Sequence, residues 1–379
     1  MNSPCPQNEV LSCKRCILTS LDHPNMVLDG KGVCDICLTY DLLCRNEVRH
    51  GSAGQVRINR LISKIQKSSS KQTYGCIVGV SGGADSSYLA LLAKEWGLKT
   101  LLVHVDGGWN TEISQNNISK LAEFTGFDLF TKVLRWEQIR DLQRAFIKAH
   151  VLDIDLPFDN AYMASLYQTA RKFGIRYILT GHNIITEGYL PPNFTYYKLD
   201  SRNIRALSKR FGECSLKGFP LMGPVREFIY SRLFRIQMIN PLNWMPYNKS
   251  ETETLLRNSI GWKDYGDKHC ENMFTRFYQN YILFNKFGIN KKKAHLQTLI
   301  CSGQLSREEA KNILNRAGTG NDNESEEQEK AFFISKLGFT ETEFDAYISA
   351  PQVLHRSYPS YMGLYYRLRP LYRMMRGNN

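Results

Sequence analysis

One short polar segment of the sequence has the residue types and spacing of a phosphate-binding site. Ser81-Gly82-Gly83-Ala84-Asp85-Ser86 follows the apolar run 74–80 and precedes a helical pattern. Glycines let backbone N–H groups approach an anion at the positive start of a helix, so we expect a phosphate cradle here. The segment lacks the ending of a Walker loop and the spacing of the dinucleotide fingerprint, which disfavours γ-phosphate hydrolysis and NAD binding. A merely tight turn is the alternative.

The pattern Ser-Gly-Gly-x-Asp-Ser resembles the PP-loop of the ATP pyrophosphatases, which split ATP between its α and β phosphates to adenylylate a substrate oxygen. The resemblance implies that residues 81–86 hold the leaving pyrophosphate. It also implies that Asp85 binds or orients Mg²⁺, a hard cation suited to two departing phosphates, and that Asp106 lies near the adenosine.

The turn Gly181-His182-Asn183 resembles the Gly-His-Asn turn that follows a strand in several PP-loop enzymes. Acidic residues commonly come straight after that turn, and Glu187 is the first carboxylate here. The resemblance therefore gives Glu187 a metal-binding role. A helix-capping asparagine and an exposed glutamate are the alternative interpretation.

Four cysteines form two pairs with the spacing of a zinc ribbon. Cys13-x-x-Cys16 and Cys34-x-x-Cys37 are separated by seventeen residues. Four thiolates complete a tetrahedron around Zn²⁺ and leave no open position for a substrate, so the predicted role is structural. Free or redox-active thiols are the alternative.

Segments along nearly the whole chain resemble the N-acetyl sugar amidotransferases of bacterial surface-polysaccharide biosynthesis, of the WbpG and PseA type. Besides the PP-loop, the resemblance rests on Cys13-Lys-Arg-Cys-Ile-Leu18, Gly32-Val-Cys-Asp-Ile-Cys37, Asp200-Ser-Arg-Asn-Ile204, Gly261-Trp-Lys-Asp-Tyr-Gly266, Lys268-His-Cys-Glu271, Phe274-Thr-Arg-Phe277, Ser302-Gly-Gln304 and Arg307-Glu-Glu309. It implies that an acetamido group of a nucleotide-linked sugar becomes acetamidino in lipopolysaccharide O-antigen synthesis, with ATP and ammonia consumed and AMP and pyrophosphate released. An adenylylated amide oxygen is a good leaving group, so ammonia can then attack the carbon.

Substrate residues are expected among polar and aromatic side chains of the second half of the chain. Arg and Lys suit an acidic sugar on a diphosphate, and Lys268 and His269 are also possible catalytic groups, His269 as a general acid or base. Packing with a charged rim is the alternative for the stretch 276–281. The set is Arg202, Asn203, Lys268, His269, Arg276 and Tyr278.

The chain shows no cysteine in a Gly-x-Cys-x-Gly elbow and none at its extreme N-terminus, so no glutaminase nucleophile is visible. We therefore expect ammonia from a separate partner. The family resemblance suggests a HisH-like glutaminase, with a HisF-like subunit as a further component.

Two rival functions remain. A tRNA-modifying PP-loop ligase or thiolase is the first, because zinc ribbons and positive charge also suit RNA. Thiolases need further paired cysteines, whereas Cys76, Cys214, Cys270 and Cys301 are isolated, so a lysidine-type ligase is the stronger variant. The second is a non-catalytic scaffold that binds nucleotide, which the intact loop with Asp85 and Ser86 argues against.

Strand and helix patterns that alternate between residues 74 and 180 position these motifs. Strands are expected at 74–80, 100–105, 129–134 and 177–180, with helices between them. Such alternation predicts an α/β fold, a doubly wound and mostly parallel sheet of Rossmann-like PP-loop type. Further helices are expected at 250–258, 271–284, 307–314 and 326–337. The predicted domains are a zinc ribbon (1–50), a linker helix (51–72), the PP-loop domain (73–245) and a helical C-terminal region (246–379).

Composition sets the outer limits. With 379 residues and 42% apolar content, the chain can bury a catalytic core with appendages. The net charge of +13 indicates anionic substrates or partners, of which we expect the nucleotide sugar rather than nucleic acid. Without a leader pattern or a long apolar run, we expect a cytoplasmic protein with no membrane span.

Overall fold

A five-stranded parallel sheet forms the centre of the computed structural model, which describes residues 10–266, 270–316, 322–363, 365 and 367. The strand order is β3-β2-β1-β4-β5, and every neighbouring pair is parallel. The strands are β1 (Cys76–Gly79), β2 (Thr100–Asp106), β3 (Asp128–Val133), β4 (Tyr177–Leu179) and β5 (Gln237–Ile239). The first four were predicted from their apolar runs. β5 was not, because it is a three-residue edge strand that is only partly buried.

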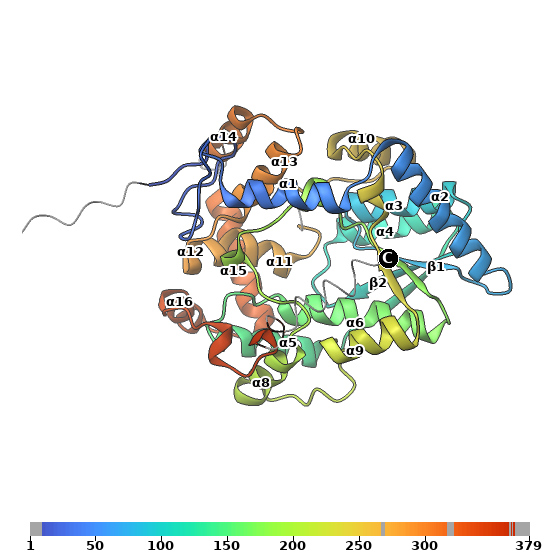
Figure 1. Ribbon diagram of the computed structural model, residues 1–379. Helices are drawn as coiled ribbons and strands as arrows, with labels where there is room; N and C mark the ends of the chain where they lie inside the picture. Colours follow the sequence, from blue (N-terminus) through green and yellow to red (C-terminus); the bar gives the residue numbers. More distant parts are fainter. Residues whose placement is uncertain (1–9, 267–269, 317–321, 364, 366, 368–379) are drawn as a thin grey trace, which may run out of the picture.

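Helices cover both faces of the sheet, as the doubly wound prediction required (Figure 1). Successive residues of β1 face opposite ways: Val78 belongs to the core under α3, and Ile77 to the core under α6. On the first face lie α2 (Gly51–Ser68), α3 (Ala84–Glu95), α4 (Glu112–Thr125) and α10 (Lys249–Ile260); α6 (Leu156–Lys172) lies on the second. The predicted α/β class is confirmed.

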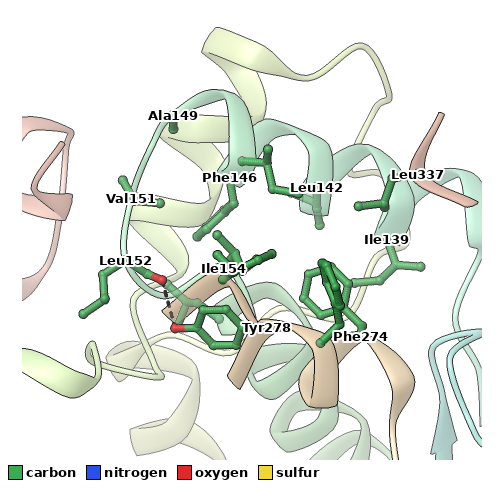
Figure 2. Packing of buried hydrophobic residues seen from close by; sticks show 14 of the residues in the cluster. Ile139, Leu142, Phe146, Ala149, Val151, Leu152, Ile154, Phe274, Tyr278 and Leu337 are labelled. Atoms are coloured by element: carbon green, nitrogen blue, oxygen red, sulfur yellow. Dashed lines mark hydrogen bonds between the residues drawn. The ribbon is translucent and has the colours of Figure 1, made fainter. Parts of the chain in front are cut away.

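The part of the chain after residue 246 is helical, as predicted, but the helix expected at 271–284 is interrupted. It consists of α11 (Met273–Phe277), the π-helical turn η4 (Tyr278–Ile282) and α12 (Leu283–Phe287). The largest core cluster joins these elements to α5 (Trp136–Lys148), and Figure 2 shows Phe274 beside Ile139 of α5 and Tyr278 beside Leu152 and Ile154. The C-terminal helices therefore share a core with the sheet domain.

The N-terminal cysteine module packs on this helical part. Its only helix in the described residues, α1 (Asp35–Glu47), lies along α13 (Lys291–Cys301), and the preceding loops lie close to α14 (Arg307–Arg316) (Figure 1). The remaining elements are α7 (Ile184–Glu187), η1 (Pro192–Phe194), α8 (Ser201–Phe211), α9 (Pro224–Phe228), η2 (Ile229–Leu233), η3 (Pro241–Trp244), α15 (Asp322–Leu337), α16 (Glu341–Ser349) and η5 (His355–Ser357). No helix in the described ranges has the length and apolar character needed to cross a bilayer.

Candidate active site and cysteine centre

A cavity of about 950 Å³ opens at the carboxyl ends of the strands, where ligands bind in open α/β sheets. One wall is the PP-loop with the start of α3. The facing wall comes from the C-terminal half of the chain and includes Tyr265, Glu271 and Tyr278. Both halves of the protein therefore contribute to one cavity.

The loop between β1 and α3 has the conformation of an anion cradle. Gly82 has a φ of 84°, and a Cβ there would lie 2.5 Å from the backbone oxygen of Ser114, so only glycine fits. The Ser81 hydroxyl accepts a hydrogen bond from Gly83 N at 3.3 Å, and the Ser86 hydroxyl donates to Gly83 O at 3.2 Å. These bonds fix the loop before the first turn of α3, whose N–H groups carry the positive end of the helix dipole.

Two side chains support the PP-loop from behind. The indole N–H of Trp262 donates to Gly82 O at 2.9 Å, and the Asn117 amide donates to the same oxygen at 3.2 Å. Asn117 also exchanges hydrogen bonds with the backbone of Lys263 at 2.8 and 2.9 Å. The Gly261-Trp262 segment of the sequence resemblance thus buttresses the phosphate cradle.

Asp85 points from the first turn of α3 toward the helical half of the chain. The hydroxyl of Tyr247 donates a hydrogen bond to its carboxylate. Burial and the Asp85 charge raise the pKa of Tyr247, so this hydroxyl stays protonated. Gly83 is crowded from the same side, because a Cβ there would lie 2.9 Å from the Tyr265 hydroxyl and 3.5 Å from Glu271 Oε1.

The Gly181-His182-Asn183 turn adjoins the PP-loop through its glycine. A Cβ on Gly181 would lie 2.6 Å from Ser86 N and 2.7 Å from the carbonyl carbon of Asp85. Asn183 is fully buried and caps α7, where its Oδ1 accepts from Thr186 N at 2.9 Å. The contacts of Asn183 are therefore those of a helix cap, as the alternative interpretation expected.

His182 and Glu187 both line the cavity and contact each other through His182 Nδ1 and Glu187 Oε2. Asp106 ends β2 without lining the cavity, and its carboxylate accepts from Gly108 N at 2.7 Å. Asp106 thus shapes the loop that follows β2.

An acidic cluster that the sequence analysis did not single out lies on the α6 side of the cavity. Lys198 Nζ is 2.7 Å from both Asp153 and Asp159. Asp155 Oδ2 accepts from the Thr275 hydroxyl at 2.7 Å, and its Oδ1 has no partner in the described structure. Burial, and then the charge of Asp159, raise the pKa of Asp155 to about 8. The visible signal was the repeated aspartate in Asp153-Ile-Asp155, just before a helix with proline in its first turn.

The residues expected to bind substrate are dispersed. Tyr278 lines the cavity, and its hydroxyl donates to Leu152 O at 2.8 Å. Arg202 is exposed on α8, and the buried Asn203 bonds to His355, with Oδ1 2.8 Å from His355 Nδ1. Arg276 forms an ion pair with Glu329 at 2.8 Å. None of these last three lines the cavity as described.

Lys268 and His269 lie outside the described residues, so their predicted roles stay predictions.

The four predicted zinc ligands converge at one buried point. The sulfur atoms of Cys13, Cys16, Cys34 and Cys37 lie within 4.8 Å of one another, and Cys16 Sγ is 3.8 Å from Cys34 Sγ. Four thiolates at about 2.3 Å from a zinc ion would be separated by about 3.8 Å, so the donor set fits tetrahedral Zn²⁺. Backbone N–H groups of Cys16 and Cys34 donate to Cys13 Sγ at 3.4 and 3.3 Å, as expected where a thiolate needs charge compensation.

The cysteine centre is tied to the C-terminal helices. Arg307 donates to the backbone oxygens of Cys16 at 2.9 Å and Cys13 at 3.2 Å. Cys301 at the end of α13 has its sulfur 3.4 Å from that of Cys37. Arg307, which the sequence resemblance included, thus serves to dock the module.

Magnesium has fewer preformed ligands. Among the residues described, the only group that meets the geometry of a metal cluster is the cysteine set. Asp85, Glu187 and Glu271 nevertheless line the same cavity. Mg²⁺ at nucleotide sites is usually held by one or two carboxylates together with phosphate oxygens and water, so these side chains fit such a site once ATP is bound.

Comparisons with known proteins address the C-terminal region directly. Residues 271–372 match the family described as LPS biosynthesis protein WbpG-like, C-terminal domain. The resemblance to the WbpG type of N-acetyl sugar amidotransferase is thereby confirmed for this region.

Two curated tRNA(Ile)-lysidine synthases from strains of Thermus thermophilus are 34% identical to the chain over 110 residues. This covers 28% of the chain and 20% of the relatives, so the match spans about a fifth of their length. NMN synthetase from Francisella tularensis has 16% identity, a TM-score of 0.29, and coverage of 55% of this chain and 94% of its own. NH3-dependent NAD synthetase from Campylobacter jejuni has 17% identity, a TM-score of 0.28, and coverage of 55% and 93%.

Proposed function

Since residues 271–372 match the WbpG-like C-terminal domain, we propose that the protein is an AMP-forming amidotransferase that acts on a nucleotide-linked N-acetyl sugar. The observation that carries the proposal is that this domain and the PP-loop border the same cavity, through Glu271 on one side and Ser81 to Ser86 on the other. The coarser part, an ATP-dependent ligase, is also supported by the partial match to lysidine synthase.

In the proposed reaction, the acetamido oxygen of the sugar attacks the α-phosphorus of ATP, and pyrophosphate leaves. Ammonia then adds to the carbon of the O-adenylyl imidate, and AMP departs to leave the amidine. The N–H groups at the start of α3 stabilise the leaving pyrophosphate. Asp85, Glu187 and Glu271 would hold Mg²⁺, which would supply further positive charge.

The acidic cluster has a role in handling protons. Ammonia loses a proton when it becomes part of the amidine, and an acceptor must lie within hydrogen-bond reach of the reaction. Burial raises the pKa of Asp155 to about 8, and its buried Oδ1 has no hydrogen-bond partner among the described residues, so Asp155 is suited to exchange a proton near neutral pH. Lys198, held by Asp153 and Asp159, fixes the charge beside it.

Ammonia would come from a separate HisH-like glutaminase, with a HisF-like subunit as a further member of the complex. The Zn²⁺ held by Cys13, Cys16, Cys34 and Cys37 has a structural role in this proposal, since four thiolates leave no open coordination position. The biological setting would be lipopolysaccharide O-antigen synthesis in the cytoplasm.

The test is incubation of the purified protein with ATP, MgCl₂, an ammonium salt and a panel of UDP- or CMP-linked N-acetyl sugars. We expect AMP release together with a sugar product lighter by the difference between oxygen and NH. A Ser86→Ala variant, which removes the hydroxyl bonded to Gly83 O, should lose AMP release while retaining its fold. A panel without any mass change would refute the proposal.

The second candidate is a tRNA-modifying ligase of the lysidine type, favoured by the 34% identity over 110 residues. It predicts AMP release with tRNA and lysine, and tRNA binding that weakens steeply with salt. AMP release with tRNA and none with sugars would establish this candidate in place of the first.

A further inference from the structure

A second, smaller hollow adjoins the catalytic cavity at the start of α13. Its volume is about 150 Å³, well below the roughly 300–1,000 Å³ of pockets that enclose whole organic ligands. It is lined by Thr186, Lys249, Gln279, Asn280, Lys291, Lys292, His295, Leu296, Leu299 and Ile313. The two hollows share Lys249, Gln279 and Lys291, so a ligand in the large cavity can extend one chemical group into the small one.

The lining of this side pocket is cationic. It includes three lysines and a histidine, and the described residues that line it include no aspartate or glutamate. Lys249 Nζ lies 3.6 Å from Glu253 Oε1. In the described part of the chain, however, no carboxylate lies within ion-pair distance of the Lys291 amine. The nearby Asp153 and Asp159 are engaged with Lys198. An anion is the ligand that would balance the charge of the Lys291 amine.

The burial of Lys291 supports the same conclusion. Burial lowers the pKa of Lys291 to about 8, because a desolvated ammonium without a close counter-ion is unfavourable. The pocket lies along one side of α13, from Lys291 to Leu299. A bound anion would give the buried Lys291 ammonium the close counter-ion that it lacks among the described residues.

We propose that the side pocket around Lys249, Lys291 and Lys292 binds the diphosphate group of the nucleotide-linked substrate, with the sugar extending into the main cavity. This inference rests on the proposed function. The side pocket also supplies the positive charge for the diphosphate that was expected from Arg202 and Arg276. Arg202 is exposed on α8, Arg276 is paired with Glu329, and neither lines the cavity. Lysine ammonium groups are well suited to phosphate as flexible point charges.

Pyrophosphate released from ATP has the same chemistry, so the experiment must separate the two sources. The PP-loop is first saturated with α,β-methylene-ATP, and UDP and inorganic pyrophosphate are then titrated separately by calorimetry. The proteins are the wild type, Lys291→Gln, Lys292→Gln and, as a matched control, Lys64→Gln, which removes an exposed lysine from the distant helix α2. Thermal unfolding verifies that each variant is folded.

We expect UDP to bind the wild type and Lys64→Gln equally, and the other two variants at least about tenfold more weakly, a loss of about 1.4 kcal/mol for each missing contact. Affinity for the ATP analogue should not change. Equal UDP affinity in all four proteins, or no UDP binding to the wild type, would overturn the proposal. Binding of pyrophosphate without UDP would assign the pocket to the product instead.

The readout is independent of turnover. If UDP binds as expected but no sugar is amidinated, the proposed reaction fails while the diphosphate site stands. If the lysine variants raise the KM for ammonium and leave UDP binding unchanged, the pocket serves the nitrogen donor, and the diphosphate assignment is wrong.

Discussion

Replacing Gly181 with alanine should damage the nucleotide site from outside the PP-loop. The added methyl group would lie 2.6 Å from Ser86 N and 2.7 Å from the carbonyl carbon of Asp85, both backbone atoms in the first turn of α3. Because backbone cannot rotate away as a side chain can, the strain must either destabilise the fold or displace the start of α3. Overpacking of this kind typically costs about 1–3 kcal/mol.

The two forms of the damage are measured separately. Strain that stays in place lowers the free energy of unfolding, which urea titration reports. Strain that is relieved by moving α3 disorders the phosphate cradle, and affinity for α,β-methylene-ATP then falls by roughly tenfold for each 1.4 kcal/mol lost. We expect the two losses together to reach at least about 1 kcal/mol.

Gly30→Ala is the matched control, because a Cβ at Gly30 meets nothing within 4 Å and the residue does not have positive φ. It should bind the ATP analogue and unfold as the wild type does. A Gly181→Ala protein that equals this control in both measurements would refute the reasoning, since the turn after β4 would then not abut the PP-loop.

Three further predictions concern the cysteine centre and the buried polar groups. Metal analysis should find about one zinc ion per chain. The Cys34→Ser variant should lose the zinc and have a lower Tm, because it removes one of the four thiolates, whereas the control Cys214→Ser should retain both the zinc and the Tm of the wild type. Tyr278→Phe should lower the free energy of unfolding by about 0.5–1.5 kcal/mol, because it removes one of two hydrogen bonds to Leu152 O and leaves only the bond from Ile154 N at 3.2 Å (Figure 2). An unchanged urea midpoint would contradict this. Burial raises the pKa of Asp155 in the folded protein from 3.8 to about 8. Between these two pH values the folded protein holds a proton that the unfolded chain has released, so the free energy of unfolding should fall as the pH rises from about 4 to about 8. Asp155→Asn should flatten that fall, and parallel stability curves for the two proteins would contradict the assignment.

The strands of the sheet that are fully buried could be predicted from the sequence. β1 is a continuous apolar run and β2 is mostly apolar because both of their faces are covered, and the Ser-Gly-Gly turn marks where β1 ends. The short edge strand β5 has no such run, and its pairing with β4 depends on contacts made between residues about sixty positions apart. The π-helical turn at Tyr278–Ile282 could not be predicted from the sequence either, because its apolar residues have the same spacing as in an ordinary α-helix.

The prediction that Arg202 and Asn203 bind substrate rested on the family resemblance of Asp200-Ser-Arg-Asn-Ile204 and on the suitability of Arg for an acidic sugar on a diphosphate. In the structure Asp200 caps α8 by accepting from Asn203 N at 3.0 Å, and it accepts from Ser360 and Tyr361 as well. The same residues therefore anchor the segment that follows η5, a long-range role that no local pattern reveals.

The cavity residues that sequence reasoning missed come from distant segments with little local signal. Lys198 lies in an irregular stretch and Lys291 at the start of a helix, and each looks like an ordinary surface lysine in the sequence. Only the fold brings Lys198 to the aspartates before α6 and Lys291 to the boundary between the two hollows. The motifs thus located the PP-loop wall of the cavity, while the opposite wall depends on tertiary contacts.

The cysteine centre is connected to this second end through one helix. α13 begins at the side pocket with Lys291, and its last turn packs on the module, where Gln297 donates to the sulfur of Cys301, 3.4 Å from that of Cys37. An N-terminal segment of this size has too little apolar surface to hold its shape unaided, so metal binding would supply its stability. A rigid module would then fix the position of α13 and with it the lysines of the pocket. If zinc binds the four cysteines and the diphosphate binds the side pocket, both as proposed, loss of the metal would therefore weaken the binding of UDP.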